Sequence, residues 1–222
     1  MSSAEQFFSE YDSLQKTLGD EELEFWLIAQ CETAAQENPD DGRMIGALYN
    51  ELGAFYKHRG ILEKAEEAFL KAKDASESLQ DANYATIINN LAGNYRLRGN
   101  FDEAISLFEQ AIEIYKQHPE TPREIYSSAY NNLALVYLDT GRFREAADML
   151  QAAYDEMKDT PDCYFEKATA FANMAVAYYK CGEADLVEEK LQMADELYQK
   201  GQLEDTPEYQ AFARLKEILQ KQ

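Results

Sequence analysis

Four stretches in the middle of the chain share one pattern of large apolar, small and polar residues. They align without gaps over 50–72, 89–111, 131–153 and 172–194. Within each stretch the apolar residues recur at intervals of three and four, which places them on one face of an α-helix. A glycine interrupts the pattern before it resumes. Each stretch therefore predicts two helices joined by a short turn.

A common numbering makes the recurrence explicit. The first large apolar residue of each stretch stands at position 7, and these anchors recur at intervals of 39, 42 and 41 residues: Leu52, Leu91, Leu133 and Met174. Position 8 is always small (Gly53, Ala92, Ala134, Ala175), position 11 is always tyrosine (Tyr56, Tyr95, Tyr137, Tyr178) and position 15 is always glycine (Gly60, Gly99, Gly141, Gly182). In the second helix the apolar positions are 20 (Ala65, Ala104, Ala146, Val187), 24 (Phe69, Phe108, Leu150, Leu191) and 27 (Ala72, Ala111, Ala153, Ala194).

The residue types have physical reasons. A small side chain at position 8 lets a neighbouring helix approach closely, and glycine at position 15 supplies the left-handed turn that ends the first helix. One antiparallel helix pair cannot bury its apolar face alone, so each pair is expected to stack on the next. The sequence thus predicts an all-α array of repeats.

The order of these residues resembles the tetratricopeptide repeat, in which W-x2-L-G-x2-Y is followed by A-x3-F. The period is longer than the usual 34 residues, and this long-period form is most similar to the repeats of kinesin light chains. The extra residues imply longer helices or longer connections. The resemblance implies a right-handed superhelical solenoid and a non-enzymatic scaffold that binds a protein or peptide.

We expect one array over 1–222, with four clear repeats at 44–78, 83–117, 125–158 and 165–200. A step of one period towards the N-terminus predicts a degenerate helix pair over 4–37, with Phe8 at position 4 and Tyr11 at position 7. Trp26 is interpreted as a core residue of that pair. A step towards the C-terminus predicts a lone capping helix over 206–221, because Thr206-Pro207 is a helix-start signal.

Composition narrows the classes of function. The formal net charge is −21, so nucleic acid and anionic membrane surfaces are disfavoured as partners. The N-terminus has no secretory pattern, and no run is long enough to span a bilayer. Three cysteines are scattered without metal or disulfide spacing: Cys31, Cys163 and Cys181. We expect a cytoplasmic protein with free thiols.

The resemblance implies a concave groove lined by positions 2, 5, 6, 9, 12 and 13 of the first helices. Asparagine recurs there at position 5 (Asn50, Asn89, Asn131) and position 6 (Asn90, Asn132, Asn173). Asparagine is a poor residue for a helix interior, so its recurrence suggests a use. A carboxamide both donates and accepts, which suits an extended peptide backbone. The alternative is that these side chains bond a neighbouring helix or face solvent.

Position 12 adds Lys57, Arg96 and Tyr179 to the candidate groove. The groove positions carry slightly more basic than acidic residues, whereas the whole chain is strongly acidic. This contrast favours a ligand that is not strongly basic and that places a carboxylate near Arg96 or Lys57. The acidic residues elsewhere fit the solvated faces of the second helices, and a basic ligand on that outer face is the alternative.

No catalytic residue, metal site or cofactor is predicted. The two histidines lack neighbouring ligands, and the phosphate-binding and nucleophile motifs are absent. Three other readings stay open. The protein could be a regulatory sensor, in which a ligand in the groove changes the superhelix. It could also be a self-association module, in which the terminal helix of one copy docks on another to form a homodimer. An enzyme is the remotest of the three. Fold by itself does not decide between them.

Overall fold

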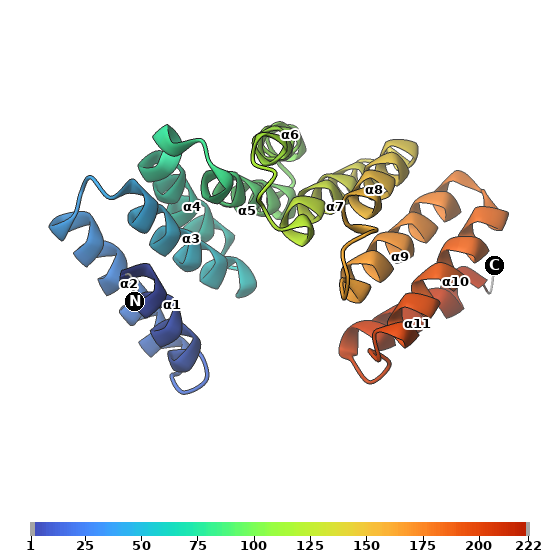
Figure 1. Ribbon diagram of the computed structural model, residues 1–222, viewed down its shortest axis with the longest axis horizontal. Helices are drawn as coiled ribbons and strands as arrows, with labels where there is room; N and C mark the ends of the chain where they lie inside the picture. Colours follow the sequence, from blue (N-terminus) through green and yellow to red (C-terminus); the bar gives the residue numbers. More distant parts are fainter. Residues whose placement is uncertain (1–2, 221–222) are drawn as a thin grey trace. The chain divides into compact units, whose positions relative to one another are not determined.

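The computed structural model describes residues 3–220, and every regular element in that range is a helix (Figure 1). The elements are α1 (Ser3–Leu14), α2 (Asp20–Glu37), α3 (Gly42–His58), α4 (Leu62–Ser76), η1 (Glu77–Leu79), α5 (Ala82–Arg98), α6 (Phe101–Gln117), α7 (Arg123–Asp139), α8 (Phe143–Met157), α9 (Tyr164–Cys181), α10 (Ala184–Lys200) and α11 (Pro207–Gln220). The predicted all-α fold of adjacent helix pairs is confirmed.

The chain folds into two compact units, Met1–Glu103 and Ala104–Gln222. In the N-terminal unit α3 packs against α2, α4 and α5. In the C-terminal unit α7 pairs with α8, α8 contacts α9, and α9 pairs with α10. The first helices of consecutive repeats also touch directly, α3 with α5 and α7 with α9. Residues on those helices can therefore bond across neighbouring repeats.

The core consists of the apolar positions of the repeat. Every residue at positions 24 and 27 is fully buried, and so are the three alanines at position 20. Position 8 of the first repeat shows how tight this packing is. A Cβ atom on Gly53 would lie 2.6 Å from the ring of Phe69, so only glycine fits beneath that ring. Small side chains thus set the distance between paired helices.

The turn glycines have the backbone conformation that the sequence predicts. Gly60, Gly99, Gly141 and Gly182 all have positive φ angles, between 72° and 81°. In the first of these turns the N–H of Ile61 donates to the carbonyl of Tyr56, which satisfies a helix-terminal acceptor. In the second turn the N–H of Asn100 donates to the carbonyl of Tyr95 in the same way. A left-handed residue at this point costs other side chains energy, which explains the recurrence of glycine.

The N-terminal helix pair is held by aromatic stacking. Phe7 and Tyr11 of α1 stack on Trp26 of α2, with ring centroids 5.3 Å and 6.2 Å apart. The buried residue one turn before Tyr11 is Phe7, at 5% exposure, whereas Phe8 is 39% exposed. The placement of Phe8 at position 4 is therefore wrong by one residue. Phe7 and Tyr11 are four residues apart and share a helix face, so both rings can stack on Trp26.

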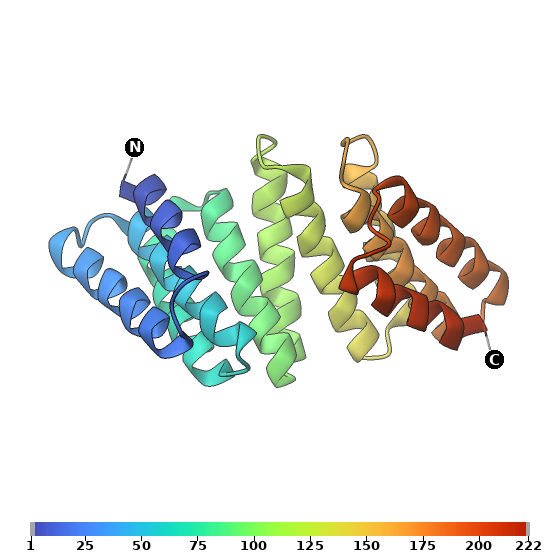
Figure 2. The same ribbon diagram turned by 90° about the horizontal axis from the view of Figure 1, so that it is seen from below.

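The last helix lies beside α9 and α10 (Figure 2). Phe212 of α11 is buried, and its ring lies 5.1 Å from that of Tyr198 in α10. Asp195 of α10 holds α11 from two sides, because it accepts hydrogen bonds from the Tyr209 hydroxyl at 3.1 Å and the Lys216 ammonium at 2.6 Å. These contacts cover the apolar face of α10.

Lys167 joins two helices of the C-terminal unit. Its side chain is buried, and Nζ donates to the backbone carbonyls of Lys158 at 3.1 Å and Thr160 at 2.7 Å. These carbonyls follow the end of α8, where the helix leaves acceptors unpaired. Lys167 of α9 therefore caps the C-terminal end of α8, where its positive charge interacts favourably with the helix dipole.

Candidate functional site

The asparagines of α3 and α5 bond each other across neighbouring repeats. Asn90 at position 6 donates from Nδ2 to Oδ1 of Asn50 at position 5, over 2.9 Å. Asn50 is 8% exposed and its own Nδ2 donates to Glu51 over 3.3 Å. Asn90 is half-buried. This bond matches the alternative in which asparagines join helices.

The C-terminal unit repeats the arrangement. Asn173 of α9 donates from Nδ2 to Oδ1 of Asn131 in α7, over 3.1 Å. Both side chains are half-buried. The two remaining candidates differ in exposure, since Asn89 is buried and Asn132 is half-buried. In both units the position-6 asparagine thus spends one of its two N–H donors on the preceding repeat.

Lys57 lies in a confined place between α3 and α5. Its Nζ is 5.6 Å from the centroid of the Phe69 ring. A Cβ atom built on Gly93 of α5 would lie 3.9 Å from the same nitrogen, an ordinary contact, so the ammonium group lies beside α5. Burial lowers the pKa of Lys57. Arg96, at the same position of the next repeat, is half-buried and has an interaction of its own.

A cavity of about 460 Å³ opens among the first helices of the N-terminal unit. Its lining combines Phe8 of α1, the Asp41–Glu51 side of α3 and the start of α5: Phe8, Asp41, Arg43, Met44, Ala47, Asn50, Glu51, Asn83, Thr86 and Ile87. The volume lies within the range of pockets that bind ligands. The lining combines apolar and polar side chains, which suits a peptide side chain with an apolar stem and a polar end.

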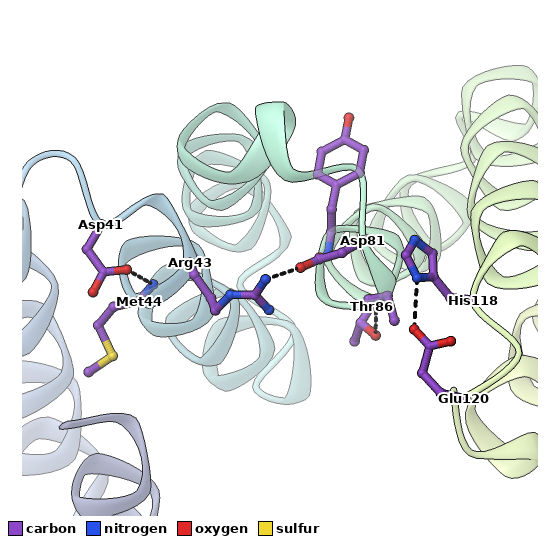
Figure 3. Close-up of polar contacts among 9 residues, drawn as sticks. Asp41, Arg43, Met44, Asp81, Thr86, His118 and Glu120 are labelled. Carbon is purple, nitrogen blue, oxygen red and sulfur yellow. Dashed lines mark hydrogen bonds and ion pairs between the residues drawn. The ribbon is translucent and has the colours of Figure 1, made fainter. Parts of the chain in front are cut away.

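The rim of this cavity is fixed by local polar contacts (Figure 3). Asp41 caps α3, since its Oδ1 accepts from the backbone N–H of Met44 over 3.0 Å. Arg43 pairs with Asp81, the residue that caps α5, over 2.6 Å. Thr86 donates to the carbonyl of Ala82 within α5. The one basic side chain on the lining is therefore already neutralised.

Glu51 is a half-buried acidic residue of the cavity lining. It occupies position 6, where the other three repeats have asparagine. Burial raises its pKa, the hydrogen bond from Asn50 opposes that shift, and the negative charge of Asp12 adds to it. No lysine or arginine of the described chain forms an ion pair with it. The carboxyl group is thus held half-buried with one amide partner.

A second cavity, of about 850 Å³, lies in the C-terminal unit at the turn between α9 and α10. Tyr179 lines it together with Lys180, Glu183, Val187 and residues at the end of α11, including Leu219. The predicted groove residue Tyr179 thus faces open space. The exposed thiol of Cys181 lies at the same turn.

The sequence analysis missed several residues that line the first cavity. Met44 and Asn83 stand at equivalent places, because each precedes the position-7 anchor of its repeat by eight residues. Both residues lie in the first turn of their helices, α3 and α5, and the long period was the one sequence signal for helices that extend beyond the aligned stretches. The spacing could not show which connection lengthened, so the cavity wall was not predicted.

No described helix has the length and apolar character needed to cross a bilayer. Within residues 3–220 there is also no group of three histidine, cysteine or acidic side chains placed to hold a metal ion.

Comparison with known proteins identifies the repeat. The family model described as tetratricopeptide repeat matches residues 44–117 and 84–159, which together span more than half of the chain. A search of curated proteins found no significant match.

Solved structures share the fold at low sequence identity. BtubC (BKLC) from P. vanneervenii superposes with a TM-score of 0.80 at 21% identity, covering 89% of this chain and 80% of that one. Repeats designated kinesin light chain TPR-like, from Podosopora anserina, give 0.70 at 19%, covering 91% and 99%. MamA gives 0.58 at 19%, covering 77% and 85%. The fold is thus similar to that of kinesin light chain repeats.

Proposed function

This chain belongs to the tetratricopeptide-repeat family, and from that premise we propose that it is a non-enzymatic scaffold that binds an extended peptide segment of a partner protein. Repeats of this family generally mediate contacts between proteins. The ligand would lie along the first helices of the repeats, where Asn90 and Asn173 occupy position 6.

The geometry of the asparagine pairs carries the proposal. Asn90 and Asn173 each use one N–H on the preceding repeat, which fixes the orientation of the amide plane. Its second N–H and its carbonyl oxygen make no other hydrogen bond within residues 3–220. A donor and an acceptor held in a fixed direction match the alternating groups of an extended backbone. Pre-orientation also lowers the entropic cost of binding.

A cavity beside the first pair supports the same reading. The cavity in the N-terminal unit is lined by Asn50 and reaches apolar side chains such as Met44 and Ile87. Backbone contacts to asparagine give affinity without sequence preference, whereas a cavity selects one side chain. We therefore place a specificity-determining side chain of the ligand here. Three free thiols accord with a cytoplasmic setting.

The test is selection from a display library of random nine-residue peptides, followed by affinity measurement with fluorescence anisotropy. We expect Asn90→Ala to weaken binding at least about tenfold, because a fixed donor and acceptor are lost. Asn50→Ala is the matched control. It breaks the same inter-helix bond but leaves the carboxamide of Asn90 in place. Because Asn50 also lines the cavity, Asn173→Ala and Asn131→Ala repeat the comparison on the equivalent pair of the C-terminal unit.

Equal losses in the two variants would show that the asparagines act only through helix packing, which would refute the proposed role. A library that yields no binder would refute peptide binding altogether. A concentration-dependent mass of the free chain in sedimentation would indicate the homodimer. A ligand-dependent change in hydrodynamic radius would indicate the sensor.

A further inference from the structure

Two half-buried charges of opposite sign lie on α3 without an ion-pair partner within residues 3–220. One is the carboxyl group of Glu51 and the other is the ammonium group of Lys57. A charge removed from water is costly unless it is paired, because the surrounding protein solvates it poorly. Two such charges on one helix therefore require a reason.

Two other basic residues of the N-terminal unit form ion pairs. Lys64 pairs with Glu24 over 2.8 Å, and Arg43 pairs with Asp81 over 2.6 Å. Lys57 has no carboxylate within ion-pairing distance in the described part of the chain. Burial alone lowers its pKa, with no acidic neighbour to oppose the shift.

Glu51 is unpaired for a reason visible in the repeat pattern. A position-6 asparagine donates to the preceding repeat, as Asn90 does, but a carboxylate cannot donate. The residue at this position in the first repeat is thus excluded from the asparagine pairing. Instead its carboxyl group lines a cavity of about 460 Å³ beside Phe8, Met44 and Ile87.

The two charges cannot neutralise each other. Six residues separate them, which corresponds to ~9 Å along the helix axis. An extended peptide advances ~3.3 Å per residue, so ~9 Å matches about three residues of a ligand lying along α3. A ligand with one basic and one acidic side chain at that separation would compensate both charges.

We propose that the N-terminal unit recognises a peptide segment carrying both charges: a lysine or arginine whose stem fills the cavity over Phe8 and Met44 and whose cation meets Glu51, and an aspartate or glutamate about three residues away that meets Lys57. This inference rests on the proposed peptide binding and adds the chemistry of the ligand. It keeps the sequence-based expectation of a ligand carboxylate near Lys57 and adds a ligand cation for Glu51. The fixed order of the charges on α3 also fixes the direction of the peptide.

The probe is a set of blocked nine-residue peptides in a serine, alanine and leucine background. Each carries one lysine and one glutamate at a spacing of one to four residues, in both orders. Lysine-only, glutamate-only and neutral peptides complete the set. Binding to the full chain is measured by fluorescence anisotropy in low salt, where ion pairs contribute most.

One order and one spacing should bind at least about tenfold more tightly than the neutral peptide. The Glu51→Gln variant should bind the preferred peptide only as tightly as the wild type binds the glutamate-only peptide. The Lys57→Met variant should bind it only as tightly as the wild type binds the lysine-only peptide. Controls with the same charge changes outside the cavity are Glu77→Gln and Lys73→Met, which pair with each other at the end of α4. Circular dichroism confirms that each variant is folded.

Charge reversal gives an independent readout. Glu51→Lys should transfer the preference to a peptide with glutamate in place of the lysine. Equal affinity for charged and neutral peptides, with Asn90→Ala still harmful, would overturn this inference and leave the proposed function intact. Failure of every peptide to bind would overturn both.

Discussion

Replacement of Gly53 by alanine should destabilise the protein, although the repeat pattern suggests the opposite. The other three repeats have alanine at position 8, and glycine inside a helix costs ~0.5–1 kcal/mol relative to alanine. From the sequence alone, Gly53→Ala would be a stabilising change. The structure argues against it, because the new Cβ would lie 2.6 Å from two atoms of the Phe69 ring.

The loss of stability depends on how far the Phe69 ring can shift away from the new methyl group. Phe69 is fully buried, so its ring cannot turn outward without displacing other core residues. Insertion of a methyl group into such a core typically costs ~1–3 kcal/mol, and contacts this short belong to the upper part of that range. After subtraction of the helix-propensity gain, we expect a net loss of about 2 kcal/mol, or ~4–8 °C in melting temperature for a chain of this size.

Gly93→Ala is the matched control. Its new Cβ would lie 3.9 Å from the Lys57 nitrogen, an ordinary contact, so the propensity gain should prevail and the variant should be more stable than the wild type. Both variants are measured by urea unfolding followed by circular dichroism. Phe69→Leu should partly rescue Gly53→Ala in a double-mutant cycle. A Gly53→Ala variant as stable as Gly93→Ala would refute the packing argument.

Three further predictions concern other contacts. Hydrogen bonds from Lys64 and a tyrosine hydroxyl lower the pKa of Glu24. The stabilising contribution of Glu24 is therefore complete above the ordinary glutamate pKa and is lost as the pH falls through the lowered value. In urea unfolding, Glu24→Gln should cost more stability at pH 7 than at pH 3. Burial raises the pKa of the Cys31 thiol to about 12, so iodoacetamide should modify the exposed Cys181 first and Cys31 only after unfolding, as read by mass spectrometry. Lys167→Met leaves two backbone carbonyls without a donor and should cost ~1–3 kcal/mol in thermal unfolding.

Sequence reasoning succeeded where local geometry dictates the residue. A left-handed turn selects glycine, so Gly60 and its equivalents revealed the helix boundaries directly. The small and large apolar positions likewise marked the core, because the periodicity of a helix fixes which residues share a face. At the degenerate N-terminal pair this information was weak, and the choice between Phe7 and Phe8 depended on an aromatic neighbour that the pattern does not reveal.

The candidate site was harder to predict because it depends on contacts between repeats. The recurrence of asparagine was visible, but its bond from Asn90 to Asn50 requires knowing that α3 and α5 lie side by side. The isolation of Lys57 was equally hidden, since pairing is a property of the surroundings and not of the residue. Positions could be predicted, whereas partners could not.

The asparagine pairing also has a meaning for how such an array can grow by gene duplication. A repeat with asparagine at both positions carries an acceptor for the following repeat and a donor for the preceding one, so a copied repeat brings its own connections. The first repeat has Asn50 but Glu51 at the next position, and the fourth has Asn173 but Ala172 before it. These two repeats can each bond on one side only. The second and third repeats thus carry both halves of the pair, so a duplicate of either could bond on both sides, whereas the first and fourth repeats carry one half each.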